Sequence, residues 1–531
     1  MNRQMKSLLL SFLMLTACAL HLKAVNVVNP PMKNEVGADV MPDDIKPLGN
    51  LPFRMKDIRK PVFPARRITI TKAELSADGK LTPAINERIA ALSKRGGGTV
   101  SIPKGHWLTG RIVLKSNVNL HLEDGAELEF SGDINDYQPA VFTRHEGVEV
   151  MGAGAFIYAE GAKNIALTGK GTIMGPPMDA AMRQLRNGNS VVEKDIDYKM
   201  PVKNRLCDGL EGRTFYRPKS FSPINCKNVL VEGVTFERSV LWNVNPVYCE
   251  NVIIRGITVN STKVPSGDGI DISSCKNVLI EYSTLNCGDD CFTLKSGRCE
   301  DGLRVSRPTE NVVIRYCLAK DGHGGITCGS ETAGDIRNVY LHDCVFDGTR
   351  TGFRFKTRRN RGGTVERIVY ERIRLIDMRE AFTWDLLGSA MFMGELARRY
   401  PPLEITPLTP TVKDITIRDF IVESTDRLLT VNAIPEIPCS NVLIENGYIR
   451  TNRIVRNISD ADGFTFSNLE INATDNAMVI DDSRNILFRN VTFHVPEGAI
   501  NFEMKGKKTE NIIMKTADGE RVCKPGLNKV Y

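Results

Sequence analysis

A short phrase recurs along most of this chain and restricts what the chain can fold into. It is an asparagine or aspartate followed by alternating Val, Ile and Leu, as in Asn228-Val-Leu-Val and Asn251-Val-Ile-Ile. Successive copies that begin at 228, 251, 277, 311 and 338 are 23, 26, 34 and 27 residues apart, a period typical of repeat architectures. Each phrase indicates a β-strand too short to fold alone, so successive coils must stack to bury their inward faces.

The repeat predicts an all-β fold, a right-handed parallel β-helix. A β-sandwich or a propeller is the alternative, but the variable spacing between phrases fits either of them less well. The 531 residues exceed one ordinary globular core and suit a solenoid that grows coil by coil. We expect a β-helix domain over residues 71–531, preceded by an irregular, proline-rich lead segment over 25–70 that either packs on the solenoid or stays mobile.

Two local departures from the repeat are expected. Residues 81–95 have Ile85, Ile89 and Leu92 at helical spacing behind Thr82-Pro83, which predicts a helix that caps the open first coil. The proline-rich stretch 395–410 is expected to be an inserted loop.

The N-terminus indicates export. A short basic start precedes an apolar run from Leu8 to Leu20, which predicts a secretion signal within residues 1–24. Leu15-Thr-Ala-Cys18 also resembles a bacterial lipobox, which would place a lipid anchor on Cys18; cleavage by the general signal peptidase is the alternative. The expected location is the periplasm, or the outer membrane as a lipoprotein. No other run of about 18 apolar residues exists, so no transmembrane span is expected.

Charge and cysteine content exclude some classes of protein. The net charge is +7, from 70 Lys and Arg against 63 Asp and Glu. Without a basic stripe interleaved with aromatics, nucleic acid is not an expected partner, whereas a polyanionic substrate is compatible. The 13 cysteines match no zinc-site spacing, and we expect no metal or cofactor. Export would permit disulfides, but we favour reduced cysteines that stack inward beside the strand phrases, namely Cys226, Cys249, Cys275, Cys317 and Cys344.

Three aspartates form the strongest candidate for chemistry. Asp268 and Asp289 are 21 residues apart, close to one coil, and stacked coils lie about 4.7–4.9 Å apart. Asp290 would point away by strand alternation unless a bend or bulge brings it back. Close carboxylates raise at least one pKa, which leaves a protonated acid beside an ionised base, as glycosidic bond cleavage requires. A lone Asp-Asp pair is more often solvated in a turn, but the motifs that follow favour a site.

A histidine and two cations follow at similar intervals. His323 lies between glycines, which allow close backbone approach. Arg354 and Lys356 share one strand face with Phe355 opposite, an arrangement that suits a carboxylated substrate. The alternative is a solvated basic run that continues to Arg361.

These motifs carry a family resemblance. Asp268-Gly-Ile-Asp, Gly288-Asp-Asp-Cys, Gly322-His-Gly and Arg354-Phe-Lys resemble, in order, the four signature motifs of the polygalacturonase family, glycoside hydrolase family 28. The resemblance implies a right-handed β-helix and hydrolysis of α-galacturonosidic bonds in a pectic polysaccharide or oligosaccharide, with inversion.

The resemblance also implies a role for each motif residue. Asp289 would be the general acid, supported by His323. Asp268 and Asp290 would position and deprotonate the water. Arg354 and Lys356 would bind the galacturonate carboxylate.

The sequence departs from the family pattern in three places. The first motif begins with Ser266 where the family usually has Asn, Phe355 replaces the usual Ile, and the family's downstream tyrosine is not found in Ala381-Phe-Thr-Trp384-Asp. A branched pectin, such as rhamnogalacturonan or a substituted galacturonan, therefore stays open as the substrate. Leu294-Lys295-Ser-Gly is similar to exo-acting members, so we expect exo action and Lys295 at the substrate site.

Two rival functions are compatible with the fold. A pectate lyase would share the polyanionic substrate but would need calcium and a base that abstracts a proton. A β-helical adhesin or carbohydrate-binding surface protein would need no catalysis. We expect a monomeric hydrolase with a pectic substrate as its partner.

Overall fold

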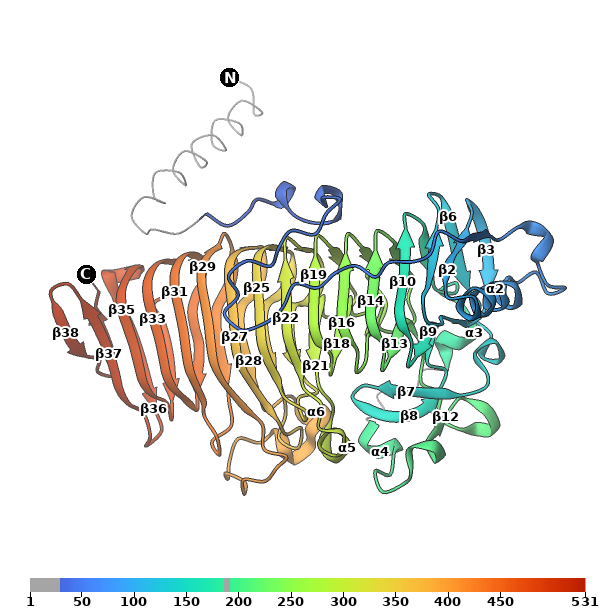
Figure 1. The fold of residues 1–531 in the computed structure, drawn as a ribbon. Helices are drawn as coiled ribbons and strands as arrows, with labels where there is room; N and C mark the ends of the chain where they lie inside the picture. Colours follow the sequence, from blue (N-terminus) through green and yellow to red (C-terminus); the bar gives the residue numbers. More distant parts are fainter. Residues whose placement is uncertain (1–28, 186–191, 531) are drawn as a thin grey trace.

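The computed structural model describes residues 29–185 and 192–530, and these wind into one elongated stack of parallel coils (Figure 1). The predicted right-handed parallel β-helix is confirmed. Its long faces are formed by a 23-stranded sheet, called sheet 1 here, and a 10-stranded sheet, called sheet 2.

Sheet 1 contains two parallel ladders that merge into long strands from β25 onward. The first ladder is β1 (Arg67–Thr69), β2 (Gly98–Ile102), β5 (Val118–Leu122), β10 (Lys163–Gly169), β14 (Lys227–Glu232), β16 (Glu250–Arg255), β19 (Lys276–Glu281) and β22 (Thr309–Arg315). The second is β3 (Gly105–Thr109), β6 (Ala126–Phe130), β11 (Thr172–Met174), β15 (Thr235–Glu237), β17 (Thr258–Asn260), β20 (Thr284–Asn286) and β23 (Leu318–Ala319). The long strands are β25 (Ile336–Asp347), β27 (Thr364–Ile376), β29 (Thr411–Val422), β31 (Cys439–Thr451), β33 (Ala461–Ala473) and β35 (Arg484–His494), followed by β37 (Glu510–Thr516) and β38 (Gly519–Val522).

Sheet 2 forms another face of the solenoid and carries most of the sequence motifs. Its strands are β18 (Ile270–Ser273), β21 (Phe292–Lys295), β24 (Gly322–Gly329), β26 (Thr349–Lys356), β28 (Met378–Asp385), β30 (Thr425–Asn432), β32 (Arg453–Ser459), β34 (Ala477–Asp481), β36 (Ala499–Lys505) and β39 (Gly526–Lys529). Isolated bridges through Val244 and Val247 connect it to a smaller sheet. That sheet comprises β4 (Ile112–Val113), β9 (Ala155–Glu160) and β13 (Lys219–Ile224).

The asparagine that opens each repeat phrase lies at a turn between faces. Asn164, Asn228, Asn251, Asn277 and Asn311 have φ between 54° and 58°, a left-handed conformation that asparagine tolerates better than most residues. Each side-chain amide donates to Oδ1 of the asparagine one coil earlier, over 2.8–3.3 Å. The turn therefore favours this residue type, and the asparagine ladder aligns one coil on the next.

The interior is apolar. The first and third apolar residues of each phrase point inward and are almost fully buried, as Val229 and Val231 in β14 illustrate. All twelve cysteines in the described residues are buried and form no disulfide there, as predicted for the five in the repeat. Those five fill inward positions as small apolar groups.

Both ends of the parallel stack are covered. Helix α2 (Thr82–Lys94) lies within the predicted range, and its Ile85, Ile89 and Leu92 are buried in the core beside the first coils. At the other end, β38 pairs antiparallel with β37, and β39 pairs antiparallel with β36. These elements end the parallel ladder.

The lead segment lies along sheet 1 (Figure 1). Residues 29–66 contain two short 3-10 turns, η1 (Lys33–Glu35) and η2 (Ala38–Val40). Leu48 and Ile58 pack on outward residues of β10, β14, β16, β19 and β22. Of the two alternatives for this segment, the structure has the packed one. The predicted signal within 1–24 and the lipid anchor at Cys18 lie outside the described residues, and among the residues described no helix is long and apolar enough to cross a bilayer.

Two excursions leave the coils on the side of sheet 2. The first, called the lobe, comprises residues 139–152, 176–185 and 192–218; it contains a β-hairpin of β7 (Val141–His145) and β8 (Val148–Gly152), with β12 (Leu206–Cys207), α3 (Ala181–Gln184) and α4 (Val192–Asp195). The second, called the insert, is residues 386–410; it contains α6 (Ala390–Met393) and η7 (Gly394–Ala397) and is irregular where the loop over 395–410 was predicted. Figure 1 shows both beside α5 (Cys299–Val305).

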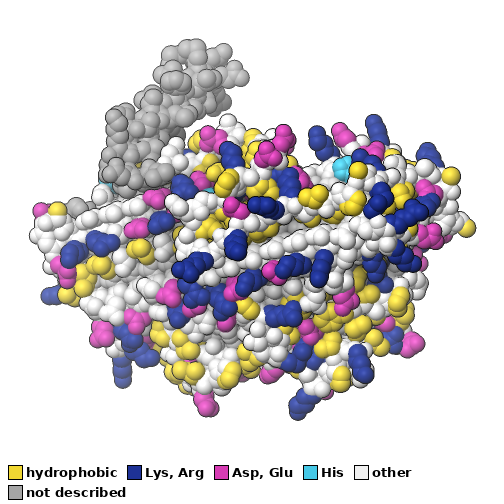
Figure 2. Space-filling view, in the orientation of Figure 1, with side chains coloured by type: hydrophobic (Ala, Val, Ile, Leu, Met, Phe, Trp, Pro, Cys, Tyr) yellow, Lys and Arg dark blue, Asp and Glu magenta, His cyan; other side chains and the backbone are white. Residues whose placement is uncertain are grey.

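Basic and acidic side chains are interspersed on the surface. Figure 2 shows Lys and Arg alternating with Asp and Glu on the face drawn. This distribution fits the modest net charge of +7.

Candidate active site

The three predicted aspartates meet in front of sheet 2. Asp268 lies just before β18, and Asp289 and Asp290 lie in a bend between β20 and β21. One carboxylate oxygen from each lies within 4.8 Å of the others. The bend has the predicted effect, because both members of the Asp-Asp pair reach the cluster. Gly288 permits it, since a Cβ there would approach the carbonyl oxygen of Val264 to 2.2 Å.

The acids of this cluster differ strongly in their affinity for protons. Burial, together with the charges of Asp271 and Asp289, raises the pKa of Asp268 well above its ordinary value. Burial also raises the pKa of Asp271, to about 7. For Asp289, burial acts in the same direction, but the hydrogen bond with His323 and the charge of Lys356 outweigh it and hold the pKa at about 2. The pKa values of Asp268 and Asp289 are thus shifted in opposite directions, which favours a proton on Asp268 over one on Asp289.

His323 is held against the acids by its flanking glycines. Its Nδ1 lies 3.0 Å from Oδ1 of Asp289, and this hydrogen bond raises the pKa of His323. A Cβ at Gly322 would lie 2.9 Å from the carbonyl oxygen of Asp289, and one at Gly324 would lie 2.7 Å from Oδ1 of Asp290. A side chain at either position would separate the histidine strand from the acids.

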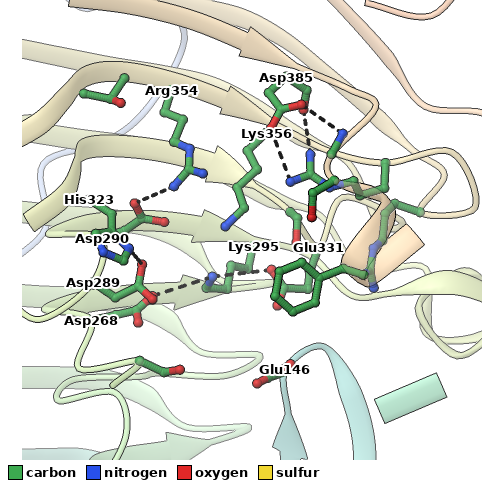
Figure 3. Close-up of a pocket in the computed structure, with 18 of the residues that line it drawn as sticks. Glu146, Asp268, Asp289, Asp290, Lys295, His323, Glu331, Arg354, Lys356 and Asp385 are labelled. Atoms are coloured by element: carbon green, nitrogen blue, oxygen red, sulfur yellow. Dashed lines mark hydrogen bonds and ion pairs between the residues drawn. The ribbon is translucent and has the colours of Figure 1, made fainter. Parts of the chain in front are cut away.

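The two predicted cations of β26 differ in their pairing. Nη1 of Arg354 donates to Oδ1 of Asp290 over 3.2 Å. Lys356 points into the pocket (Figure 3) and forms no ion pair or side-chain hydrogen bond within the described part of the chain. Burial and the neighbouring Arg354 lower the pKa of Lys356. Lys356 is therefore a desolvated cation that a ligand carboxylate would stabilise.

Lys295 also lies in the pocket wall, but its charge is already balanced. Its Nζ lies 3.4 Å from Oε2 of Glu331, 3.6 Å from Oδ1 of Asp271 and 3.9 Å from Oδ2 of Asp268, and 4.7 Å from the ring centre of Trp242. The ammonium group of Lys295 is therefore already surrounded by the carboxylates of the pocket.

The pocket is larger than the motifs alone define. It has a volume of about 920 Å³, and both excursions contribute to its lining. The lobe supplies His145, Glu146 and Tyr216, and the insert supplies Phe392 and Met393. Figure 3 shows Glu146 across the pocket from Arg354, with Lys295 and Glu331 between them.

Sequence reasoning found the residues nearest the acids and missed the walls. Glu331 follows the Gly-His-Gly motif closely in the sequence. This short separation from His323 was a signal that could have identified Glu331 as a pocket residue. Glu146 and Phe392 gave no signal, because each lies in an excursion outside the repeat.

The aspartate cluster is built for proton transfer. Its oxygens are close enough to hold a cation by distance alone, but Arg354 already donates to Asp290, and the Lys295 ammonium lies beside Asp268. Clustered carboxyls with unequal pKa values can protonate a leaving oxygen and activate a water, which is the chemistry of glycosidic bond hydrolysis. The fold and this site together define a glycoside hydrolase.

Comparison with known proteins identifies the family. The sequence profile of glycosyl hydrolases family 28 matches residues 93–384, more than half of the chain, and the chain belongs to this family. It is similar to a probable polygalacturonase of Vitis vinifera, 27% identical over 69% of this chain and 70% of the relative. An exo-poly-alpha-D-galacturonosidase of Dickeya chrysanthemi is 24% identical over 76% of this chain and 71% of the relative.

A solved structure supports the same assignment. The hyperthermoactive exopolygalacturonase of Thermotoga maritima superimposes with a TM-score of 0.62 at 26% identity, covering 89% of this chain and 96% of that one. The resemblance seen in the four motifs is thus confirmed along most of the fold.

Proposed function

We propose that this enzyme hydrolyses α-galacturonosidic bonds in pectic galacturonan and releases sugars from the chain end. The observation that carries the substrate class is Lys356, a partly buried cation that lines the pocket with the aspartate cluster and has no ion pair among the described residues. Desolvated cations bind carboxylates strongly because water no longer competes for either charge. The names of the relatives, polygalacturonase and exo-galacturonosidase, support the same substrate.

In the proposed mechanism, Asp289 and His323 act as a unit. The pKa of Asp289 is about 2, so in the free enzyme the proton of the pair lies on the imidazole. As the glycosidic bond breaks, Asp289 passes this proton to the leaving oxygen while His323 supplies it over their 3.0 Å contact. The pair must therefore enter the reaction holding one proton.

Asp290 and Asp268 hold the water in this proposal. Arg354 donates to one oxygen of Asp290, which leaves the other oxygen to take a proton from water. Asp268 has a raised pKa, so it orients the water by hydrogen bonding instead of acting as the base. The family resemblance gave positioning and deprotonation of the water to Asp268 and Asp290 together. In this proposal Asp268 positions the water and Asp290 deprotonates it.

End-directed action is supported by the walls of the pocket. The lobe and the insert both line the cavity beside the aspartate cluster, an arrangement that favours binding of a chain end. Product analysis on tri- to hexagalacturonate tests this proposal: monomer alone at early times supports it, and a mixture of intermediate oligomers contradicts it. Ultraviolet-absorbing unsaturated products would instead indicate a lyase.

Two further experiments test the stereochemistry of the reaction and the branching of its substrate. Inversion is proposed from the family resemblance, and NMR of the first-formed anomer tests it. The aspartate oxygens lie within 4.8 Å of one another, less than the about 6.5–9.5 Å usual for inverting pairs, so net retention would assign one of them as a nucleophile. A panel of rhamnogalacturonan and substituted galacturonan fragments distinguishes plain from branched substrates.

We also propose that the enzyme is exported and acts as a monomer in the periplasm or on the outer membrane. The basic start, apolar run and Cys18 context support this. Metabolic labelling with palmitate should mark the wild type and leave Cys18→Ala unlabelled; absence of label from both would indicate plain signal cleavage. Light scattering after gel filtration tests the monomer.

A further inference from the structure

The wall of the pocket formed by the lobe carries an acid that the mechanism does not use. Glu146 lies at the tip of the β7–β8 hairpin and lines the pocket. Its side chain is 33% exposed, and its Oε2 lies 3.4 Å from Nη1 of Arg298. A carboxylate held beside a guanidinium at the wall, and still open to the cavity, can accept hydrogen bonds from a ligand.

The hairpin tip is fixed in place by its contacts with the solenoid. Gly147 accepts hydrogen bonds through its carbonyl from the backbone N–H of Arg298 and from Nε of Arg144. A Cβ at Gly147 would lie 2.8 Å from Cγ of Glu331 and 2.9 Å from Cβ of Arg298. Glu146 therefore has a defined position relative to the strand that carries Lys295.

Glu146 lies among cations at its end of the pocket, because Arg217 and Arg298 also line the wall there. Arg354 and Lys356 lie across the pocket from Glu146, with Lys295 and Glu331 between (Figure 3). Glu146 would repel a sugar carboxylate placed next to it, whereas it would accept hydrogen bonds from sugar hydroxyls. His145 beside it adds no positive charge, because burial lowers its pKa well below the ordinary value.

We propose that Glu146, paired with Arg298, binds the free hydroxyl groups of the terminal sugar and thereby makes cleavage depend on a chain end. The inference rests on the proposed function. Inside a 1,4-linked galacturonan, the C4 oxygen is glycosidic and has no proton to donate. Only the non-reducing end offers a C4 hydroxyl, so a carboxylate acceptor in the lobe wall of the pocket selects that end chemically.

The test compares two trisaccharides that differ at this hydroxyl. One is trigalacturonate, and the other is its 4,5-unsaturated counterpart made by a pectate lyase, which lacks the C4 hydroxyl. For Glu146→Ala we expect kcat/KM on trigalacturonate to fall by about 10–100-fold, the usual effect of losing a charge-assisted hydrogen bond. The rate on the unsaturated substrate should change little, so the preference for the hydroxylated end collapses.

Further variants separate recognition from structure. Glu146→Gln keeps an acceptor oxygen and should retain most of the preference, whereas Glu146→Asp withdraws the oxygen from the pocket and should lose it. Glu211, a lobe acid that pairs with Arg213 over 2.7 Å and is 82% exposed, is the matched control, and Glu211→Ala should leave both rates unchanged.

The outcomes are distinct. Equal losses on both substrates in Glu146→Ala and Glu146→Asp, or no loss on either, would overturn the inference while leaving the proposed function intact. A wild-type enzyme that hydrolyses neither trisaccharide would overturn the proposed function, and this inference with it.

Discussion

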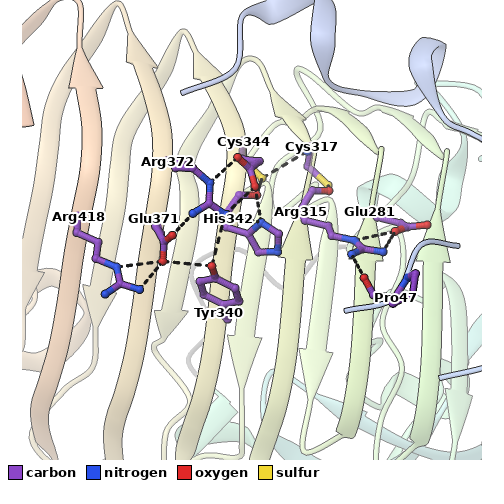
Figure 4. Close-up of polar contacts among 11 residues, drawn as sticks. Pro47, Glu281, Arg315, Cys317, Tyr340, His342, Cys344, Glu371, Arg372 and Arg418 are labelled. Atoms are coloured by element: carbon purple, nitrogen blue, oxygen red, sulfur yellow. Dashed lines mark hydrogen bonds and ion pairs between the residues drawn. The ribbon is translucent and has the colours of Figure 1, made fainter. Parts of the chain in front are cut away.

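Two histidine–aspartate pairs lie on different faces of the solenoid and behave in opposite ways. In the pocket, His323 contacts Asp289 over 3.0 Å; on sheet 1, His342 contacts Asp343 over 2.6 Å (Figure 4). The His323 side chain is 52% exposed and that of His342 is 8% exposed. The hydrogen bond that His323 donates to Asp289 raises the pKa of His323, whereas burial lowers the pKa of His342 despite its aspartate. Solvent access, and not the pairing itself, decides which histidine can hold a proton.

The cations on the two faces differ in the same way. Arg315 on sheet 1 donates to Glu281 and to backbone carbonyls of Lys46 and Pro47 in the lead segment (Figure 4). Lys356 in the pocket has no such partner within the described residues. On sheet 1 the charges hold the molecule together, while in the pocket a charge is left for a ligand to neutralise.

The largest expected effect comes from removing the proposed acid. Asp289→Asn should lower kcat on oligogalacturonate by about 10²–10⁴-fold, because the amide cannot deliver a proton, while the affinity for the substrate is retained. Asp343→Asn is the matched control on sheet 1 and should keep full activity. Turnover and calorimetric binding measure both, and normal hydrolysis by Asp289→Asn would show that another residue is the acid.

The two cations should separate activity from stability. Lys356→Met should lower kcat/KM by about 10–100-fold without lowering the melting temperature, because it removes a partly buried charge that has no ion pair among the described residues. Arg315→Met should leave kcat/KM unchanged and reduce the free energy of unfolding by about 1.5–3 kcal/mol, since Arg315 is one of the two cations, with Arg255, that pair with the buried Glu281. Denaturant unfolding and steady-state kinetics on both variants decide this, and a reversed pattern would refute the contrast between the faces.

The pH dependence of activity should report the pocket pair. The raised pKa of His323 means that the proton shared with Asp289 is present below the ordinary histidine value of about 6.5 and is lost as the pH rises through the raised value. The alkaline limb of kcat/KM should therefore lie above pH 6.5. In His323→Ala, Asp289 must hold the proton alone, and the limb should move to lower pH. His342→Ala should leave the limb in place; an identical shift in both variants would contradict the assignment.

The smallest expected effect is that of chelation. Lys295 and Arg354 already contact the acids that could hold a cation, so EDTA should leave the rate unchanged. Loss of activity in EDTA, restored by Ca²⁺, would indicate a metal-dependent reaction.

The repetitive part of the molecule could be predicted from sequence because its signals are local. Within one phrase, the opening asparagine specifies the turn, and the apolar residues after it specify the strand and its inward face. The spacing of the motifs, close to one coil, predicted that Asp268 lies beside Asp289. The raised pKa of Asp268 and the lowered pKa of Asp289 could not be assigned in advance, because they depend on burial and on which acid the histidine contacts. The lobe was not predicted, since its short strands do not share the period.

Because of the asparagine ladder, the coils and the loops of this protein have separate roles. Each amide is bonded only to the coil before it and the coil after it, so alignment of the stack is transmitted from neighbour to neighbour and does not depend on the length of the chain between them. A family built this way can vary substrate preference by lengthening or exchanging segments such as the lobe and the insert, while the aspartates stay on undisturbed coils. Specificity can thus change in evolution without cost to the reaction chemistry.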